Sequence, residues 1–457
     1  MRSFNSYFWM VITHVAIGTI CYLVSAVAMA LSVVIVVGGL IYIVKKQNKQ
    51  HEALLVAAYI TGAEVFLRAA HGVPFYEYGK YCVALVIGFG LYFNGFSKNA
   101  TAYWIFLLLL IPGVILGNSV LSSSIENRKI ISFVISGPLC LGLCTLYTYQ
   151  RRVTLQQFYD ILLAMALPAI SLTVFVILFT PNLRDVLTGT GSTAATSGGF
   201  GPNQVSTILG LAMFIFVSRA LLQSPDIRFI GLNLFVASVV AFRGINTFSR
   251  GGMITGIVML LALLYGLYQQ VRGITRVRIL YAFGGIAMVG MFVWSYSLIK
   301  TDGLIGKRYA NQDASGKVKE SRLTGREEIA QMEIDAFLEN PILGVGVGKT
   351  IDMREEESGT NTASHDEITR MLAEHGSLGI MMLLILIFTP IILRLDNKQN
   401  FMMFPLLIFW FLTINHSSMR IAASGFVYSL SLLKIQFPAS LKPKPRRFPG
   451  MTNNPTS

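Results

Sequence analysis

Long apolar runs recur along almost the whole chain. An α-helix needs about 20 apolar residues to cross a bilayer, and runs approaching this length lie at 52–68, 79–93, 101–117, 131–148, 159–179, 205–222, 228–246, 250–268, 279–299, 372–393, 401–415 and 421–436. The run at 9–43 is too long for one upright span and short for two. It is interpreted either as a tight hairpin near Ser25–Ser32 or as one long tilted helix. The pattern predicts an all-α polytopic membrane protein with about 12–14 transmembrane helices, unless one or two short segments are re-entrant.

Composition supports the membrane class. Of the 457 residues, 53% are hydrophobic and only 13% are charged, and the mean hydropathy is +0.60. These values exclude an ordinary soluble chain of two or three domains. All four cysteines lie in apolar segments, and no histidine or acidic residue lies near Cys140 and Cys144, so packed thiols are favoured over a metal or disulfide site. The first apolar run lacks a small-residue cleavage site, which predicts an uncleaved anchor.

Positive charge falls in alternate loops and in the tail. The basic side chains are Lys45, Lys46, Lys49, Lys98, Arg151, Arg152, Arg228, Arg272, Arg276, Arg278, Arg394, Lys398, Lys442, Lys444, Arg446 and Arg447. The positive-inside rule places these loops and the C-terminus in the cytoplasm. The loops near 69–78, 118–130, 180–204, 243–250 and 300–371 then face outward, which in a bacterium means the periplasm.

Residues 300–371 form the only long polar segment, and they hold 14 of the 23 acidic residues against ten Lys and Arg. We therefore divide the chain into an N-terminal transmembrane bundle (1–299), a periplasmic catalytic loop (300–371), C-terminal transmembrane helices (372–436) and a basic cytoplasmic tail (437–457). The Gly-, Ser- and Thr-rich loop 180–204 is interpreted as a flexible linker or as one border of a substrate groove.

Two capping boxes predict local structure in the polar segment. Thr324 with Glu327 predicts a helix over about 325–338, which Asn340-Pro341 ends. Ser364 with Glu367 predicts a second helix that begins at His365 and continues into the 372–393 span. The run Gly344–Thr350 superficially resembles a phosphate-binding loop, but Leu343 occupies the place of a required glycine. A turn with close backbone packing is the better interpretation.

His365 is the leading candidate for chemistry. A helix N-terminus disfavours the imidazolium form, and neutral imidazole accepts a proton from a hydroxyl near pH 7. The neighbouring acids Asp366 and Glu367 favour the imidazolium form, so the net effect on the protonation of His365 is left open. The structural alternative is a polar residue at the water interface.

Several arginines are candidates for binding an anion. Arg250 lies where an outer turn enters the 250–268 span, beside two glycines that allow close approach. It either binds phosphate or reaches to lipid headgroups. Arg326 lies in the first turn of its predicted helix, where a cation is unfavourable without a reason such as an anionic ligand. Arg322 lies close by, and both arginines also have an ion-pair interpretation.

Further charged residues are assigned lower rank. His416 and Arg420 lie at the last outer turn and are second-tier candidates. Glu64 and Arg68 are spaced i, i+4 in an apolar helix, which predicts that they neutralise each other. No Asp-x-Asp or other metal cluster occurs in the sequence, so no metal or cofactor is predicted.

Three blocks in the same order resemble the O-antigen ligase/polymerase superfamily of bacterial membrane glycosyltransferases. They are Ser249-Arg250-Gly251-Gly252, then Gly325-Arg326 followed by Asn340-Pro341-x-x-Gly344-x-Gly346, and then His365 with Leu372, Glu374 and Gly376-Ser-Leu-Gly379. The resemblance covers about residues 205–393. Asp366 departs from it, because the family often has asparagine there.

The resemblance implies a GT-C-like fold in the bacterial inner membrane. It implies that His365 activates an acceptor hydroxyl, and that Arg250 and Arg326 hold the diphosphate of an undecaprenyl-diphosphate-linked glycan. An inverting, metal-independent O-antigen ligase acting on lipid A–core in lipopolysaccharide biosynthesis is the leading hypothesis. No nucleic-acid partner is predicted, and the sequence does not indicate an oligomeric state.

Other functions remain open at this point. A polysaccharide repeat-unit polymerase uses the same donor and differs only in its acceptor. A protein O-oligosaccharyltransferase is a third member of the same group. A lipid-linked glycan transporter favours charges along many spans and internal repeats, whereas only Glu64 and Arg68 form a clear mid-span pair and no repeat is seen. A non-catalytic assembly protein would not require His365.

Overall fold

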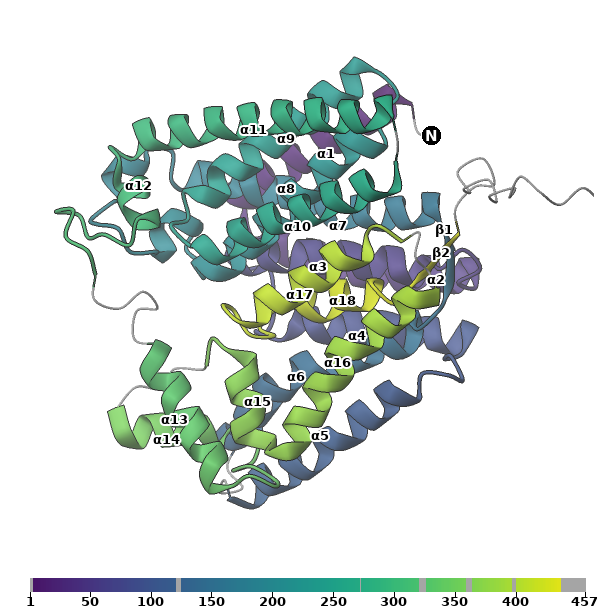
Figure 1. Ribbon diagram of the computed structural model, residues 1–457, viewed down its shortest axis with the longest axis vertical. Helices are drawn as coiled ribbons and strands as arrows, with labels where there is room; N and C mark the ends of the chain where they lie inside the picture. Colours follow the sequence, from purple (N-terminus) through teal and green to yellow (C-terminus); the bar gives the residue numbers. More distant parts are fainter. Residues whose placement is uncertain are drawn as a thin grey trace, which may run out of the picture.

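The computed structural model describes residues 3–120, 125–271, 273–319, 326–358, 364–396 and 400–436, and these are almost entirely helical. The first eleven helices form most of the bundle (Figure 1): α1 Phe4–Leu23, α2 Ser25–Lys46, α3 Glu52–Ala69, α4 Tyr78–Asn94, α5 Thr101–Val120, α6 Ile125–Thr148, α7 Leu155–Phe179, α8 Pro202–Leu222, α9 Ile227–Ile245, α10 Arg250–Gln270 and α11 Ile274–Lys300. The remaining helices are α12 Leu304–Tyr309, α13 Arg326–Glu339, α14 Lys349–Ser358, α15 Glu367–His375, α16 Ser377–Asp396, α17 Met403–Ile414 and α18 Ala422–Leu430.

The expected all-α membrane fold is confirmed. Ten helices of the described ranges are long and apolar enough to cross a membrane, namely α1, α2, α5–α11 and α16. The predicted spans 52–68 and 79–93 correspond to α3 and α4. Neither is among the ten helices, because α3 carries three charged residues, Glu52, Glu64 and Arg68, and α4 has only 17 residues.

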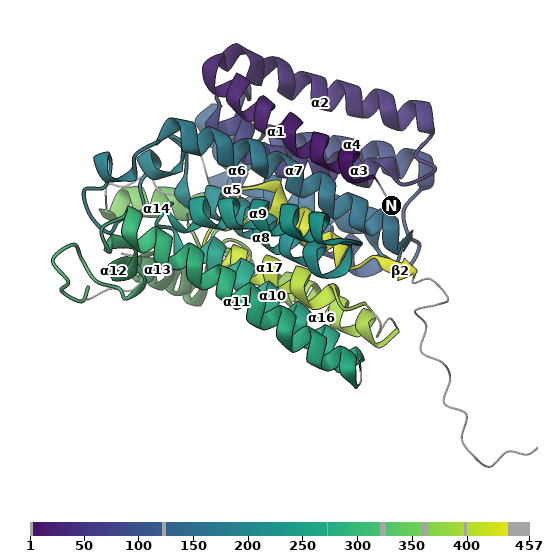
Figure 2. The same cartoon turned by 90° about the horizontal axis from the view of Figure 1, so that it is seen from above.

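The long N-terminal run is a hairpin. Val24 has extended backbone angles (φ −135°, ψ 93°) and separates α1 from α2. The two helices lie side by side at one edge of the bundle (Figure 2). The hairpin alternative is therefore correct, although the turn lies one residue before the predicted Ser25–Ser32 region.

The predicted spans 401–415 and 421–436 are shorter than expected. With 12 and 9 residues, α17 and α18 have lengths of about 18 and 14 Å, whereas the hydrocarbon core is about 30 Å thick. The two helices pack against each other, α17 also packs on α10, and α18 packs on α6. They form a hairpin whose turn, residues 415–421, is called the polar turn below.

A small parallel sheet fixes the far end of this hairpin. β1 (Arg152–Thr154) pairs with β2 (Lys434–Gln436), with Val153 opposite Ile435. The centre of the bundle is formed by α3, α7 and α8, which are buried on nearly all sides. The sheet therefore connects the end of α18 to the loop that precedes the central helix α7.

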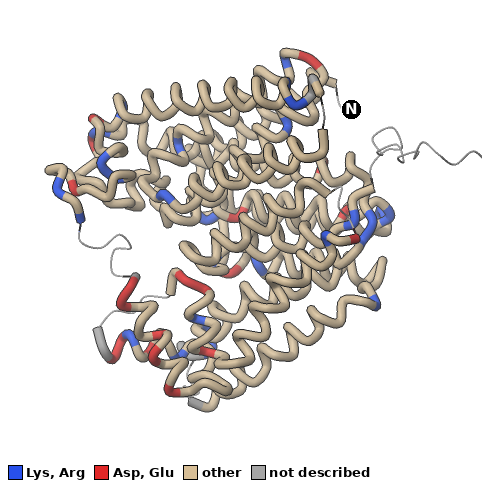
Figure 3. Tube along the Cα trace, in the orientation of Figure 1, with Lys and Arg blue, Asp and Glu red and all other residues tan. Residues whose placement is uncertain are grey.

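The predicted polar segment lies at the opposite end of the bundle. There α12 lies on one side of the polar turn and α13–α15 on the other (Figure 1). Acidic residues gather on α13–α15, and basic residues gather near β1 and β2 (Figure 3). The membrane orientation deduced from loop charge stays a prediction.

The helix predicted over 325–338 is confirmed as α13, although its proposed N-cap Thr324 lies outside the described residues. The glycine-rich run after α13 forms the predicted close-packed turn. Gly344, Gly346 and Gly348 all have positive φ. Val347 donates a backbone hydrogen bond to Gly113 of α5 at 2.9 Å, so this turn attaches the polar segment to the bundle.

The second predicted helix is wrong at both ends. Its N-cap is Asp366, whose Oδ1 accepts from the backbone N–H of Ile368 at 2.8 Å. The helix α15 begins at Glu367, so His365 precedes it. Gly376, at φ +59°, ends α15 and separates it from α16. The helix therefore does not continue into the following span.

Candidate active site at the polar turn

The polar turn holds His416 through both ring nitrogens. Nδ1 lies 2.7 Å from the carbonyl oxygen of Leu412, and Nε2 lies 3.1 Å from Oγ1 of Thr207 on α8. The first contact spans one helical turn of α17, and the second joins the turn to a central helix. The side chain of His416 is therefore fixed in position and orientation.

Arg250 begins α10 directly beside this histidine. A Cβ atom on Gly251 would lie 2.5 Å from Cδ2 of His416, closer than any real contact. Ser249, which caps the helix, donates from Oγ to Oδ1 of Asn203 at 2.7 Å. The glycine predicted to permit close approach thus admits an imidazole ring, and this places Arg250 on one flank of the polar turn.

The guanidinium group of Arg250 faces α12. Its Nη1 donates to the carbonyl oxygen of Arg308 at 3.4 Å. Burial raises the pKa of Tyr309 to about 12, and the charges of Arg250 and Arg308 oppose that rise. Two guanidinium groups therefore lie near one phenol, in a region of positive potential.

His365 lies on the other flank of the turn. Its carbonyl oxygen accepts from the backbone N–H of Ser418 at 3.1 Å. The carbonyl oxygen of Ser364 accepts from Oγ of Ser418 at 3.0 Å and from Nη2 of Arg420 at 2.8 Å. Three hydrogen bonds thus dock the residues around His365 onto the polar turn, and the ring is half-buried.

The observed N-cap changes the electrostatics expected for His365. Its backbone is outside the helix, and the carboxylate of Asp366 occupies the helix N-terminus instead. Burial raises the pKa of Asp366, while backbone hydrogen bonds from Ile368 and Thr369 lower it. The argument from the helix dipole therefore applies to Asp366 more directly than to His365.

A buried acid supports the residue before His365. Glu333 of α13 accepts hydrogen bonds from Oγ of Ser364 at 3.1 Å and from Oγ1 of Thr369 at 2.5 Å, and its other oxygen pairs with Arg354 at 2.9 Å. Burial raises the pKa of Glu333, and Thr369 and Arg354 oppose the rise. The carboxylate thus joins three segments of the polar region.

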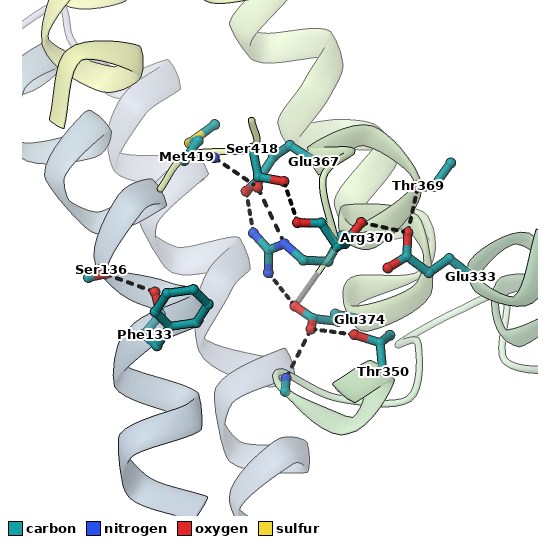
Figure 4. A network of polar contacts seen from close by, with 12 residues as sticks. Phe133, Ser136, Glu333, Thr350, Glu367, Thr369, Arg370, Glu374, Ser418 and Met419 are labelled. Atoms are coloured by element: carbon teal, nitrogen blue, oxygen red, sulfur yellow. Dashed lines mark hydrogen bonds and ion pairs between the residues drawn. The ribbon is translucent and has the colours of Figure 1, made fainter. Parts of the chain in front are cut away.

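Further buried ion pairs and hydrogen bonds lie beside it in α15 (Figure 4). Arg370 pairs with Glu367 and with Glu374, and Glu374 also accepts from the backbone N–H of Gly348 at 3.0 Å. Glu367 accepts from the backbone N–H of Met419 at 3.3 Å. α15 is therefore tied both to the glycine-rich turn and to the polar turn.

Sequence reasoning missed these acids as positioning residues. The sequence predicts for Glu367 a capping role and an electrostatic effect on His365, for Glu374 a place in the family motif, and for Glu333 no role. The signal for Glu333 was its position on the apolar face of an otherwise acidic helix, where its side chain is fully buried.

The side chains of two predicted site residues lie outside the described residues. Arg326 is the first residue of α13, but its side chain lies outside the described residues, as does the whole of Arg322. Among the residues that the structure describes, no group of three or more His, Cys, Asp or Glu is arranged to hold a metal ion. The four cysteines are buried and free, and Glu64 pairs with Arg68 as predicted.

An apolar groove approaches the Arg250 side of the site. It lies between α8, α9, α10 and α11 and is lined almost wholly by aliphatic and aromatic side chains. Trp294 and Tyr309 line one end, with their ring centroids 5.1 Å apart. Such a groove can accommodate a hydrocarbon chain next to the arginines.

The fold and this site define a polytopic helical membrane protein with a basic, histidine-containing centre at one end of its bundle. Residues 233–384 match the family described as O-Antigen ligase. This match supports a relationship to the O-antigen ligase/polymerase superfamily over that region, which includes Arg250, Arg326 and His365 but ends before the polar turn. No curated protein matches the chain.

Proposed function

We propose that the protein is an O-antigen ligase-type glycosyltransferase. It moves a glycan from undecaprenyl diphosphate to a hydroxyl of lipid A–core at the periplasmic face of the inner membrane. The observation that carries this proposal is the placement of Arg250 and His365 on opposite flanks of the polar turn. An anion-binding group and a proton acceptor on either side of one fixed element suit a displacement reaction.

The reaction is a single displacement. The acceptor oxygen forms a bond to the anomeric carbon of the glycan, and its proton passes to His365. The bond from that carbon to the phosphate oxygen breaks, and its electron pair leaves with the diphosphate. Attack from the opposite face inverts the anomeric configuration, and Arg250 and Arg326 stabilise the charge that develops on the leaving group.

The apolar groove supports a lipid-linked donor. Its lining offers almost no polar group, and it ends at Tyr309, beside Arg250 and Arg308. A polyprenyl chain bound there would place its diphosphate at the arginines without leaving the bilayer. His365 lies across the polar turn, where an acceptor hydroxyl can approach.

Reconstitution with defined substrates tests the proposal. Purified protein in lipid vesicles receives undecaprenyl-diphosphate glycan, with or without lipid A–core. Glycan on lipid A–core is the expected product. A longer lipid-linked glycan would show a repeat-unit polymerase instead, and intact donor under both conditions would refute glycosyl transfer.

A further inference from the structure

The short helix α12 holds Tyr309 at one end of the apolar groove. α12 lies at the end of α11 (Figure 1), and Tyr309 is its last residue. Ile305 in the same helix is fully buried, and its backbone N–H donates to Oγ1 of Thr301 at 3.3 Å. Just beyond the helix, the carbonyl oxygen of Gln312 accepts from Oγ1 of Thr190 at 2.8 Å. The backbone is therefore anchored on both sides of Tyr309.

The ring of Tyr309 has an aromatic partner. Trp294 on α11 meets it edge to face, with the ring planes at 84° and the centroids 5.1 Å apart. Such a pair contributes about 0.5–1.5 kcal/mol beyond the burial of its area. Both rings line the groove, so together they form its wall at this end.

The hydroxyl of Tyr309 differs from the other hydroxyl that lines the groove. Ser238 donates to the carbonyl oxygen of Leu234 in its own helix, at 2.7 Å. Tyr309 makes no hydrogen bond to any residue that the structure describes. Its charged neighbours are Arg250 and Arg308, and guanidinium groups donate hydrogen bonds but do not accept them. The phenol is therefore a donor without an acceptor in the described part of the chain.

Burial keeps this hydroxyl protonated. It raises the pKa of Tyr309 to about 12, although Arg250 and Arg308 oppose the rise. At neutral pH the phenol is thus uncharged and able to donate. Buried tyrosine hydroxyls usually have a hydrogen-bond partner. An anion beside the two arginines would supply this partner and would also be attracted by their charge.

The groove has the size and the chemistry for a lipid with an anionic head. Its volume is about 380 Å³, which falls in the range of roughly 300–1,000 Å³ for small-molecule sites. Aliphatic side chains line most of it, and the donors gather at the Tyr309 end. A hydrocarbon chain fits the first part, and a phosphate group fits the second.

We propose that the hydroxyl of Tyr309 donates a hydrogen bond to the diphosphate of a polyprenyl-linked donor, and that the rings of Tyr309 and Trp294 pack on its first isoprenoid unit. A phosphate oxygen supplies the acceptor that the phenol lacks, and hydrogen bonds to ionised acceptors are the stronger kind. The aromatic wall fixes where the chain ends, so the diphosphate lies beside Arg250. The inference rests on the proposed function, to which it adds two binding residues outside the sequence motifs.

Binding of radiolabelled farnesyl diphosphate to the full chain in dodecyl maltoside tests the role of the hydroxyl. Tyr309→Phe keeps the ring and its packing on Trp294 and removes only the O–H group. Affinity for farnesyl diphosphate is expected to fall by about tenfold or more, as for the loss of a hydrogen bond to a charged group. Affinity for farnesol, measured by competition, is expected to stay unchanged because farnesol has no phosphate. Wild-type affinity for the diphosphate, or an equal loss for both ligands, would overturn the proposal.

A second variant tests the packing on the isoprenoid unit. Trp294→Ala is expected to weaken the binding of farnesol and of farnesyl diphosphate together, because both contain that unit. A loss confined to the diphosphate would contradict this part of the proposal. The matched control is Tyr296→Phe, since Tyr296 packs on Phe242 with centroids 5.1 Å apart but lies outside the groove lining. It is expected to bind both ligands as the wild type does, and a loss equal to that of Tyr309→Phe would argue against a specific role for Tyr309.

Nanodiscs of phosphatidylcholine with and without phosphatidylglycerol identify the lipid. Binding of farnesyl diphosphate is expected to be the same in both, whereas displacement by phosphatidylglycerol would assign the site to phospholipid headgroups and overturn the polyprenyl occupant. These assays contain no acceptor and measure no transfer. Selective loss in Tyr309→Phe without glycan transfer by the wild type would uphold the site and refute the transfer reaction. Transfer by the wild type with undiminished binding in Tyr309→Phe would do the reverse.

Discussion

Arg420 donates a hydrogen bond from Nη2 to the carbonyl oxygen of Ser364, at 2.8 Å. This contact joins the polar turn near the end of the described chain to the residue before the proposed base. His416 in the same turn packs against Gly251, next to Arg250. One short turn therefore sets the spacing between Arg250 and His365 in the proposed centre, although neither residue belongs to the turn.

The first prediction concerns the base. His365→Gln is expected to lower the rate of glycan transfer by about 10²–10⁴-fold, the usual contribution of a positioned general base. Steady-state transfer in reconstituted vesicles measures this loss. His71→Gln serves as a control, because His71 is an exposed residue in the α3–α4 turn. Full activity in His365→Gln would exclude the assigned role.

Guanidinium geometry at Arg250 is the subject of the second prediction. Arg250→Lys keeps the charge but loses the planar fork that binds two phosphate oxygens at once. We expect the rate of transfer to fall by about 10²-fold or more, as for the loss of a transition-state donor. Arg228→Lys is the control, since Arg228 is exposed and pairs with Asp226 at 3.0 Å. Equal loss in both variants would argue against a specific role for Arg250.

A methyl group at Gly251 provides a third test. Gly251→Ala places a Cβ atom within 2.5 Å of the His416 ring, so the ring must move from Thr207. We expect lower thermal stability, by about 1–3 kcal/mol for overpacking, and reduced transfer. Gly284→Ala in α11 has no atom within 4 Å of the added group, and it is expected to be neutral or stabilising. Similar behaviour of the two variants would contradict the proposed packing.

The fourth prediction concerns Glu333. Glu333→Gln leaves the buried cation of Arg354 without its carboxylate, which typically costs about 3–5 kcal/mol. Unfolding measured in detergent is expected to show this loss, and transfer is expected to fall because Ser364 loses a partner. Glu333→Gln combined with Arg354→Met is expected to recover part of the stability. Glu356→Gln, at an exposed ion pair, is the neutral control, and no recovery in the double variant would argue against an uncompensated charge.

The dependence of stability on pH gives the fifth prediction. Burial lowers the pKa of His375 to about 3 from an ordinary value of 6.5. The unfolded chain therefore binds a proton that the folded chain does not, and stability is lost as the pH falls from 6.5 towards 3. Within this range, the slope that His375 adds to the free energy of unfolding against pH approaches about 1.4 kcal/mol per pH unit.

Substitution isolates this contribution from those of other groups. The free energy of unfolding is measured at several pH values. His375→Leu is expected to reduce its slope against pH by the amount that the uptake of one proton contributes. The raised pKa values of Glu333 and Glu374 act in the opposite direction, since stability from their protonation grows as the pH falls. His71→Leu is the exposed control, and an unchanged slope in His375→Leu would contradict the prediction.

Local patterns predicted much of the fold and the individual candidates. The lengths of the apolar runs predicted the membrane helices, and the acidic amphipathic run after Gly325 predicted α13. The ion pair of Glu64 with Arg68 also follows from i, i+4 spacing, because both side chains lie on one helix face.

Long-range contacts explain what local patterns missed. Ser364 and Asp366 are both good N-caps, and the local pattern favoured Ser364 because Glu367 follows three residues later. In the fold, the Ser364 hydroxyl bonds Glu333, and its carbonyl oxygen accepts from Ser418 and Arg420. These partners lie 31, 54 and 56 residues away, so no local window includes them.

The shortness of α17 and α18 was missed for a different reason. Their sequences are largely apolar, as in a membrane span, because α18 is buried throughout and α17 is buried except on the side of Phe404 and Phe411. The polar turn between them is sparse in charge, since Arg420 is its one residue of the types Lys, Arg, Asp and Glu. Its importance comes from what it contacts.

The position of the polar turn near the end of the described chain has a consequence for biosynthesis. Chains emerge from the ribosome N-terminus first, so Arg250, Glu333 and His365 are all made before residues 415–421. Until the α17–α18 hairpin inserts, the Ser364 and His365 carbonyl groups lack the donors that dock them. The proposed centre is therefore completed last, because a nascent chain held in the membrane contains Arg250 and His365 before it contains the turn that sets the distance between them.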